Sequence, residues 1–409
     1  MASSTHEIVI LGGNFGGINA VHHLLRQVIP SLQKLSPSTN FHVTLVTPNT
    51  HFYFKVAAPR ALINNTLIPA DKIFKSIPDI LKQYGDSRCS FLRGKAVALN
   101  PSTRTITVEV VGAGNREVRY DSLFISTGTT STSPLWGIHD DHEKTLKALN
   151  HLHTVLPKAK TVLIAGAGPV GVETVGEIAH AFPSTKITLV SASNVLPHNP
   201  YLSSKAKKCL QAAKIELVTN TRVQTTPSTG TGGTVTLSNG SSKTVDLFID
   251  ARGVEKVNSE FLPKSWLDKT QRIKTRDAYF RVKGDGTSDV SRIYAIGDIV
   301  SGSTNTAIEL DAQLLSAASS FAVDVASSLP HENKHSGVLG FLGIGSNVPT
   351  QKEFKPMKDT LFVPVGPKSG VGAMMGWGAP TWLVVKGKAE KFLVDHVEPM
   401  VSGEKYKRV

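Results

Sequence analysis

The pattern that most constrains this fold occurs twice: an apolar strand, a glycine loop, a helix and a second strand. The first copy spans residues 7–46 and contains the loop "GGNFGG" (12–17). The second copy spans residues 161–190 and contains the loop "GAGPVGVE" (166–173). A glycine loop between a strand and a helix is typical of a dinucleotide-binding βαβ unit. Two copies predict an α/β fold with two Rossmann-like domains and two bound nucleotides.

The glycine loops have the residue types that a pyrophosphate requires. Phosphates bind backbone N–H groups at a helix N-terminus, where the helix dipole favours negative charge. In the first loop Asn14 replaces the middle glycine, and we expect it to tolerate a left-handed backbone and to bond to phosphate. The predicted binding residues of the two loops are Gly12, Gly13, Asn14, Phe15, Gly16 and Gly17, and then Gly166, Gly168 and Gly171.

The second strand of each unit lacks the acidic residue that would bind a ribose 2′-hydroxyl. Thr47 follows the first of these strands and Ser191 follows the second. Without a carboxylate, the second unit does not repel the 2′-phosphate of NADP, but no Arg follows that strand either. The sequence therefore leaves the choice between NADH and NADPH open.

The order of the motifs predicts a discontinuous first domain. We expect an FAD-binding domain in two parts, residues 1–148 and 264–330, separated by an NAD(P)H-binding domain over residues 149–263. Residues 331–409 are rich in Gly, Pro and β-branched residues and predict a small C-terminal β-rich domain. We expect a linker near residues 327–337 and tryptophans 377 and 382 in the core of the last domain.

Composition excludes several other classes. The chain has 409 residues, a net charge of +13 and two cysteines, Cys89 and Cys209. The basic residues are scattered and no recognition motif accompanies them, so we do not expect nucleic-acid binding. Isolated cysteines exclude a Cys-x-x-Cys redox pair, and the histidines lack metal-binding spacing. The absence of a long apolar run or a leader peptide predicts a cytoplasmic protein.

The whole set of motifs resembles the pyridine-nucleotide-dependent flavoprotein oxidoreductases. The resemblance rests on "GGNFGG", "YDSLFISTGT" (120–129), "GAGPVGVE", "DLFIDARG" and "YAIGD". Two further stretches, "HFYFKVAAPRAL" (51–62) and "GVGAMMGWGAPTWLVVKGK" (370–388), resemble the apoptosis-inducing-factor-like branch. That branch includes the ferroptosis suppressor and is related to the type II NADH dehydrogenases. The ferroptosis suppressor's myristoylation signal is lacking.

The resemblance implies FAD in the first loop and NADH or NADPH in the second. It implies that Arg60 contacts the flavin nucleotide and that Val97 meets the adenine through its backbone. It also implies that Asp298 binds the ribityl chain, where we further expect it to cap a helix, and that Glu173 lies near the nicotinamide and flavin. Thr127, Gly128 and Gly297 complete the set of expected cofactor-binding residues.

These expectations leave more than one function open. The resemblance implies hydride transfer from NAD(P)H to FAD and onward transfer to a quinone-like acceptor. The alternatives are a tailoring oxidoreductase for a small metabolite, an NADH oxidase, and a redox-gated binding module with incidental turnover. A basic, apolar C-terminal segment also suits contact with a membrane or lipid-droplet surface. The oligomeric state is open.

Overall fold

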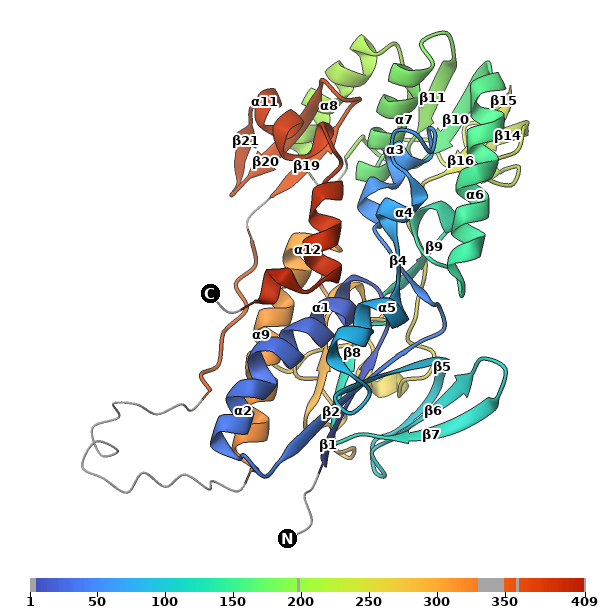
Figure 1. Ribbon diagram of the computed structural model, residues 1–409. Coiled ribbons are helices and arrows are strands. Elements are labelled where there is room, and N and C mark those ends of the chain that lie inside the picture. The colour runs from blue at the N-terminus through green and yellow to red at the C-terminus, as the bar shows by residue number, and fades with distance from the viewer. Residues whose placement is uncertain (1–4, 197–198, 330–348, 358–359, 408–409) are drawn as a thin grey trace.

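The computed structural model describes residues 5–196, 199–329, 349–357 and 360–407. Two sheets lie along the long axis of the molecule, and the C-terminal region runs beside both of them (Figure 1). Most of the expected linker, residues 327–337, lies outside the described residues.

The first sheet has seven strands in the order β18-β8-β1-β2-β5-β6-β7. The pairs from β18 to β5 are parallel, and β5, β6 and β7 continue as an antiparallel extension. β1 ends in residues buried on both faces, as parallel strands between helices require. The bounds are β1 (Thr5–Leu11), β2 (Asn40–Thr47), β5 (Cys89–Asn100), β6 (Thr105–Val110), β7 (Gly114–Arg119), β8 (Ser122–Ile125) and β18 (Ile293–Ala295).

The second sheet has four parallel strands in the order β12-β11-β10-β16. A three-stranded antiparallel sheet packs on it through a separate apolar cluster. The strands of these sheets are β10 (Thr161–Ala165), β11 (Lys186–Val190), β12 (Glu216–Val218), β16 (Leu247–Asp250), β13 (Val223–Thr225), β14 (Gly233–Leu237) and β15 (Ser242–Val245). The predicted α/β fold with two dinucleotide-binding units is confirmed.

Long helices cover the sheets, and a short ribbon of β9 and β17 connects the two halves. Helix α1 continues into α2 through a π-turn over Leu24–Val28 and packs against α9. The larger helices are α1 (Phe15–His23), α2 (Ile29–Leu35), α6 (His142–Val155), α7 (Pro169–Ala181), α8 (Pro200–Ala212) and α9 (Ala307–Ala326). Shorter elements are β3 (His51–Tyr53), α3 (Ala58–Ala61), α4 (Ala70–Ile73), β4 (Phe74–Ser76), α5 (Ile77–Leu81), β9 (Thr129–Ser131) and β17 (Val254–Val257).

The C-terminal region combines strands with short helices that the sequence did not predict. Its elements are β19 (Leu361–Pro364), β20 (Gly370–Met374), β21 (Trp377–Ala379), α11 (Thr381–Val384), a π-turn over Val385–Ala389 and α12 (Val397–Val401). The chain then returns to α1 (Figure 1). There His22 donates from Nε2 to the carbonyl of Val401 (2.9 Å) and accepts from Tyr84 at Nδ1 (2.5 Å). Tyr406 donates to the Asn19 side chain (3.0 Å).

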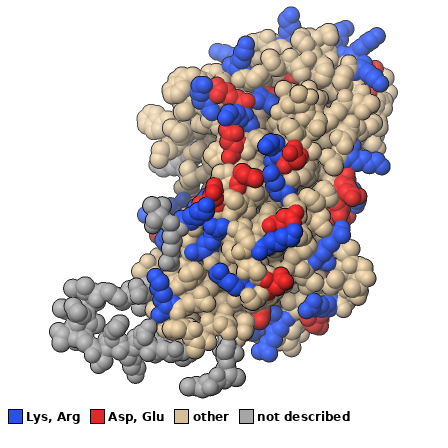
Figure 2. Space-filling view, in the orientation of Figure 1, with Lys and Arg blue, Asp and Glu red and all other residues tan. Residues whose placement is uncertain are grey.

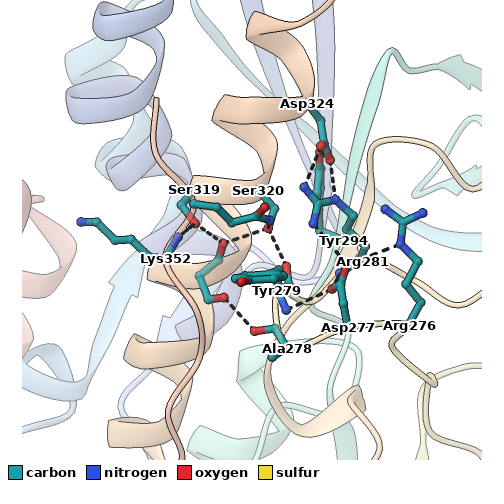
Figure 3. Close-up of polar contacts among 12 residues, drawn as sticks. Arg276, Asp277, Ala278, Tyr279, Arg281, Tyr294, Ser319, Ser320, Asp324 and Lys352 are labelled. Atoms are coloured by element: carbon teal, nitrogen blue, oxygen red, sulfur yellow. Dashed lines mark hydrogen bonds and ion pairs between the residues drawn. The ribbon is translucent and has the colours of Figure 1, made fainter. Parts of the chain in front are cut away.

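A second segment of this region lies along α9 (Figure 3). The backbone N–H of Lys352 donates to Ser319 (2.8 Å), and that of Phe354 donates to the carbonyl of Ala278 (3.1 Å). Beside them Arg281 forms two hydrogen bonds to Asp324 (2.7 and 2.8 Å) (Figure 3). These contacts hold the C-terminal half of α9 against the neighbouring segments.

Two tryptophans do not lie where the sequence suggested. Trp377 and Trp382 were expected in the core, but they are 81% and 67% exposed. Met374 and Met375 in the same hairpin are also exposed. Strand β21 ends its three-stranded sheet, and no described element covers its apolar side chains. Within the described ranges, no helix has the length and apolar character to cross a membrane.

Candidate functional site

A cavity of about 480 Å³ lies at the carboxyl edge of the first sheet. Its walls come from the first glycine loop, the end of β2, the middle of β5, the turn after β8 and the start of α9. In open parallel sheets, ligands bind at this edge where neighbouring strands diverge. The cavity therefore lies where a dinucleotide is expected.

The outer glycines of the first loop are required by the backbone around them. Gly12 has a φ of +102°, and a Cβ there would lie 2.4 Å from the carbonyl oxygen of Ser126. A Cβ on Gly17 would lie 1.7 Å from the carbonyl oxygen of Gly12. Gly13 and Gly16 face the side chains of Thr47 and Ser126 at similarly short range. Larger residues at these positions would disrupt the turn even in the absence of a ligand.

The reason given for Asn14 was wrong. Its φ is −104° and its ψ is −146°, so its backbone is not left-handed. Its Oδ1 atom accepts a hydrogen bond from the backbone N–H of Tyr53 (3.2 Å), so only the Nδ2 group could donate to a phosphate. Asn14 precedes α1 and lines the cavity, and its side chain fastens the loop to β3.

The far end of the cavity combines Asp298 with the start of α9. Gly297 has a φ of +82°, and its N–H donates to Gln313 (2.6 Å). Asp298 lies inside a 3-10 turn over Gly297–Ile299 and approaches Lys55 at 3.5 Å. Asp298 is not the N-cap of this turn, because Ile296 occupies that position. The N-cap of α9 is Thr306, whose hydroxyl accepts from the N–H of Glu309 (3.3 Å).

Of the other residues expected to bind FAD, Thr127 and Gly128 line the cavity and Val97 does not. Thr127 and Gly128 line the cavity, and Thr127 is fixed by two hydrogen bonds to Asn258 (2.8 and 2.9 Å). A Cβ on Gly128 would meet no atom within 4 Å. Val97 does not line the cavity, although its neighbours Gly94 to Ala96 do. A bulge in β5 between Ala96 and Ala98 shifts the register at Val97 and leaves its side chain exposed.

The second loop repeats the geometry of the first but leaves its middle position open. Gly166 has a φ of +109°, and a Cβ there would lie 2.3 Å from the carbonyl oxygen of Ala251. A Cβ on Gly171 would lie 1.8 Å from the carbonyl oxygen of Gly166. A Cβ on Gly168, the N-cap of α7, would meet nothing within 4 Å. This opening at a helix N-terminus fits a second pyrophosphate.

Arg60 does not line this cavity, although the resemblance implied contact with the flavin nucleotide. It is buried and donates to both oxygens of Glu177 on α7 (2.7 and 2.9 Å) and to the carbonyl of Glu390 (2.8 Å). Its guanidinium also lies 4.6 Å from the ring centre of Phe392. These partners hold the guanidinium in a junction inside the protein, away from the cavity beside the first glycine loop.

Glu173 belongs to the same junction. It is buried one turn before Glu177, and its Oε1 atom lies 2.5 Å from Nζ of Lys388. Burial raises the pKa of Glu173, and the nearby ammonium of Lys388 opposes this rise. The sequence alone did not indicate Lys388 as its partner. Two carboxylates one turn apart on an apolar helix could have indicated a pair of buried cations.

The structure therefore places most of the residues expected to bind FAD around one cavity. Arg60, Val97 and Glu173 do not line it. Among the described residues, no group of three or more His, Cys, Asp or Glu side chains could hold a metal ion. The closed turn around Gly12, the open faces of Gly128 and Gly168 and the helix N-termini suit FAD in the first unit and a nicotinamide nucleotide in the second.

Two of the curated relatives match 98% and 71% of the chain. "Oxidoreductase phnG" of Penicillium herquei is 31% identical, covering 98% of this chain and 97% of that protein. "Ferroptosis suppressor protein 1" of Xenopus tropicalis is 27% identical, covering 71% of this chain and 73% of that protein.

Solved structures share the fold. NDH2 of Plasmodium falciparum in complex with RYL-552 superposes with a TM-score of 0.64 at 17% identity, covering 99% of both chains. The sulfide:quinone oxidoreductase of Aquifex aeolicus gives 0.67 at 13% identity, covering 97% of this chain and 92% of that chain. The family described as pyridine nucleotide-disulphide oxidoreductase matches residues 6–315. The chain belongs to this family and is an FAD-dependent oxidoreductase that takes its electrons from NADH or NADPH.

Proposed function

We propose that this oxidoreductase delivers its electrons to a quinone-like acceptor. The observation that carries the proposal is the state of the two cysteines. Cys89 is buried at the start of β5, and burial raises the pKa of its thiol to about 12. Cys209 is half-buried on α8 and unpaired. A protonated thiol is a poor nucleophile, and neither cysteine has a partner for a disulfide relay. The electrons must therefore leave the cofactor directly.

The residues of this chain would position the two cofactors and set the electrostatic potential around them. The first loop, Thr127, Gly128 and Asp298 would hold FAD, and the second loop would hold the nicotinamide nucleotide. FAD, when bound, accepts hydride equivalents from the nicotinamide and returns electrons to an acceptor. The N-terminus of α9 points its helix dipole toward one end of the cavity, where Lys55 is paired with Asp298.

The two ion pairs Arg60–Glu177 and Lys388–Glu173 suit a role in closing the site. Lys388 brings the C-terminal region to Glu173, and Arg60 brings α3 to Glu177. Both carboxylates lie on α7, the helix that begins at Gly168. We infer that this arrangement aligns the second nucleotide with the cavity.

Two kinds of relatives support different acceptors. The ferroptosis suppressor supports the branch expected from the sequence, and the name of the Aquifex aeolicus protein includes a quinone. The phnG protein and "Oxidoreductase ptaL" of Pestalotiopsis fici, 32% identical, favour the second candidate, an oxidoreductase of a small metabolite.

We also propose that the C-terminal hairpin contacts an anionic lipid surface, through which an apolar acceptor could arrive. Trp377, Trp382 and Met375 are exposed together, and Lys386 is exposed nearby. Tryptophan beside lysine is the composition of interfacial membrane contacts. Lys388, two residues after Lys386, is instead largely covered and paired with Glu173. Sedimentation with anionic and neutral vesicles tests this, and equal recovery of wild type and Trp377→Ser with Trp382→Ser contradicts it.

The acceptor is tested with Cys89→Ser combined with Cys209→Ser. We expect full reduction of short-chain quinones by NAD(P)H, because no thiol carries electrons. Oxygen serves as the comparison acceptor and should be slower. Loss of turnover in this variant, with FAD still bound, would contradict direct transfer. A binding module with incidental turnover would instead reduce every acceptor slowly.

A further inference from the structure

The loop after β11 has a fixed position beside the second glycine loop. The N–H of Leu196 donates to the carbonyl of Ala167 (2.9 Å), inside that glycine loop. Ser191 ends the strand, and its hydroxyl donates to the carbonyl of Asn194 (3.1 Å). In a dinucleotide-binding unit, the end of this strand lies beside the 2′ position of the adenosine ribose. The loop over 191–196 is therefore the part of the molecule that meets this ribose.

This loop is rich in hydrogen-bond donors and cations. Nζ of Lys207, on α8, donates to Oδ1 of Asn194 (2.7 Å), so its ammonium bonds to a neutral amide. The N–H of Thr221 donates to the carbonyl of Ser191 (2.9 Å), which brings the loop after β12 alongside. Arg222, with an exposed side chain, follows Thr221 directly.

Carboxylates are scarce in the same stretch. Between residues 186 and 222 the only acidic residue is Glu216. Its oxygens accept from Lys243 (2.8 and 2.9 Å) and from Thr188 (2.7 Å). Over the middle of the face in Figure 2, Lys and Arg alternate with carboxylates, whereas Lys and Arg predominate along the upper edge. The local potential near the loop is therefore positive.

We propose that this loop is a 2′-phosphate subsite and that NADPH is the preferred electron donor. A ribose 2′-hydroxyl is held best by an acceptor such as a carboxylate, and the loop has none. A 2′-phosphate instead requires donors and positive charge. The exposed hydroxyl of Ser193 and the ammonium of Lys207, which uses one of its three N–H groups on Asn194, meet that requirement. The proposal depends on the second loop binding the nicotinamide nucleotide and not on the identity of the acceptor.

The test measures binding of two adenosine nucleotides to the FAD-loaded protein by calorimetry. Adenosine 2′,5′-bisphosphate and 5′-AMP differ only in the 2′-phosphate. We expect the bisphosphate to bind about 10- to 100-fold more tightly, the range of charge-assisted hydrogen bonds. Lys207→Ala should lower the affinity for the bisphosphate about tenfold and leave 5′-AMP unchanged. Lys207→Glu should abolish the preference.

Lys208→Ala is the matched control, because Lys208 is exposed on the same helix and should leave both affinities unchanged. Anaerobic flavin reduction then compares NADPH with NADH, and Lys207→Ala should raise the apparent Kd for NADPH alone. Equal binding of the two nucleotides by the wild type would overturn the proposal, as would an equal loss of both in Lys207→Ala. Neither outcome bears on the acceptor, which the cysteine variant tests separately.

Discussion

The two glycine loops have the same backbone but differ at their centre. In both loops the first glycine is left-handed, and the last lies against the carbonyl of the first. At the middle position, Asn14 is fastened to Tyr53, whereas Gly168 faces open space. The outer glycines are therefore required by the protein's own packing. Packing does not fix the identity of the middle residue, so this position can suit either a ligand or a contact with a neighbouring strand.

The helices that follow the loops are also held in different ways. Helix α1 is joined to the C-terminal region by neutral hydrogen bonds: His22 donates to Val401, and Asn19 accepts from Tyr406. Helix α7 is joined to α3 and to the C-terminal region by two buried ion pairs. The two units should therefore respond differently to substitution and to pH.

The largest effect should come from Gly12→Val. A side chain there meets the backbone of Ser126 and must adopt an unfavourable φ. We expect a loss of roughly 4 kcal/mol or more, with little folded yellow protein recovered. Flavin absorbance and thermal unfolding are the measurements. Stable, FAD-loaded protein from this variant would show that packing does not require the glycine.

Gly168→Val should instead leave the fold intact and remove the second nucleotide. Its side chain enters open space where the pyrophosphate would lie, so we expect at least ~100-fold weaker NAD(P)H binding with FAD retained. Anaerobic titration of the flavin band measures this. Gly171→Val is the control, which should misfold because of its contact with Gly166. Flavin reduction at the wild-type affinity would mean that the two loops have been assigned wrongly.

Breaking one ion pair on α7 should have the next largest effect. Glu177→Ala leaves the buried guanidinium of Arg60 without its carboxylate, and we expect a loss of about 3 kcal/mol in the free energy of unfolding. Urea unfolding measures it. Replacing Arg60 and Glu177 together by Met should recover part of the loss. An unchanged midpoint in Glu177→Ala would show that this pair does not stabilise the junction.

Mild acid should weaken the attachment of α1. Burial lowers the pKa of His22 from 6.5 to about 4. Because the folded pKa is the lower one, this contribution is complete above pH 6.5 and is lost as the pH falls toward 4. Between pH 7 and pH 5 we expect a loss of roughly 2 kcal/mol from this group. His22→Gln should reduce the slope of stability against pH, and an identical slope would exclude His22 as its cause.

The sequence predicted the parts of the site that depend on local backbone chemistry. Strand, glycine loop and helix follow one another in the chain, so the positions of Gly12, Gly166 and Asp298 could be inferred from spacing. The partners of Arg60 and Glu173 could not, because they come from residues between 117 and 330 positions away. The exposure of Trp377 could not be predicted either, because an apolar strand has the same sequence pattern whether or not another element covers its face.

The central claim is direct transfer of electrons from NAD(P)H, through FAD, to a quinone-like acceptor. Its most direct test is anaerobic stopped-flow measurement of the second half-reaction alone. Protein reduced with one equivalent of NADPH is mixed with a short-chain quinone, and return of the oxidised flavin band is followed. The account predicts reoxidation that is faster than with oxygen and fast enough to support steady-state turnover. Reoxidation by the quinone that is no faster than by oxygen, or that is too slow for turnover, would contradict it.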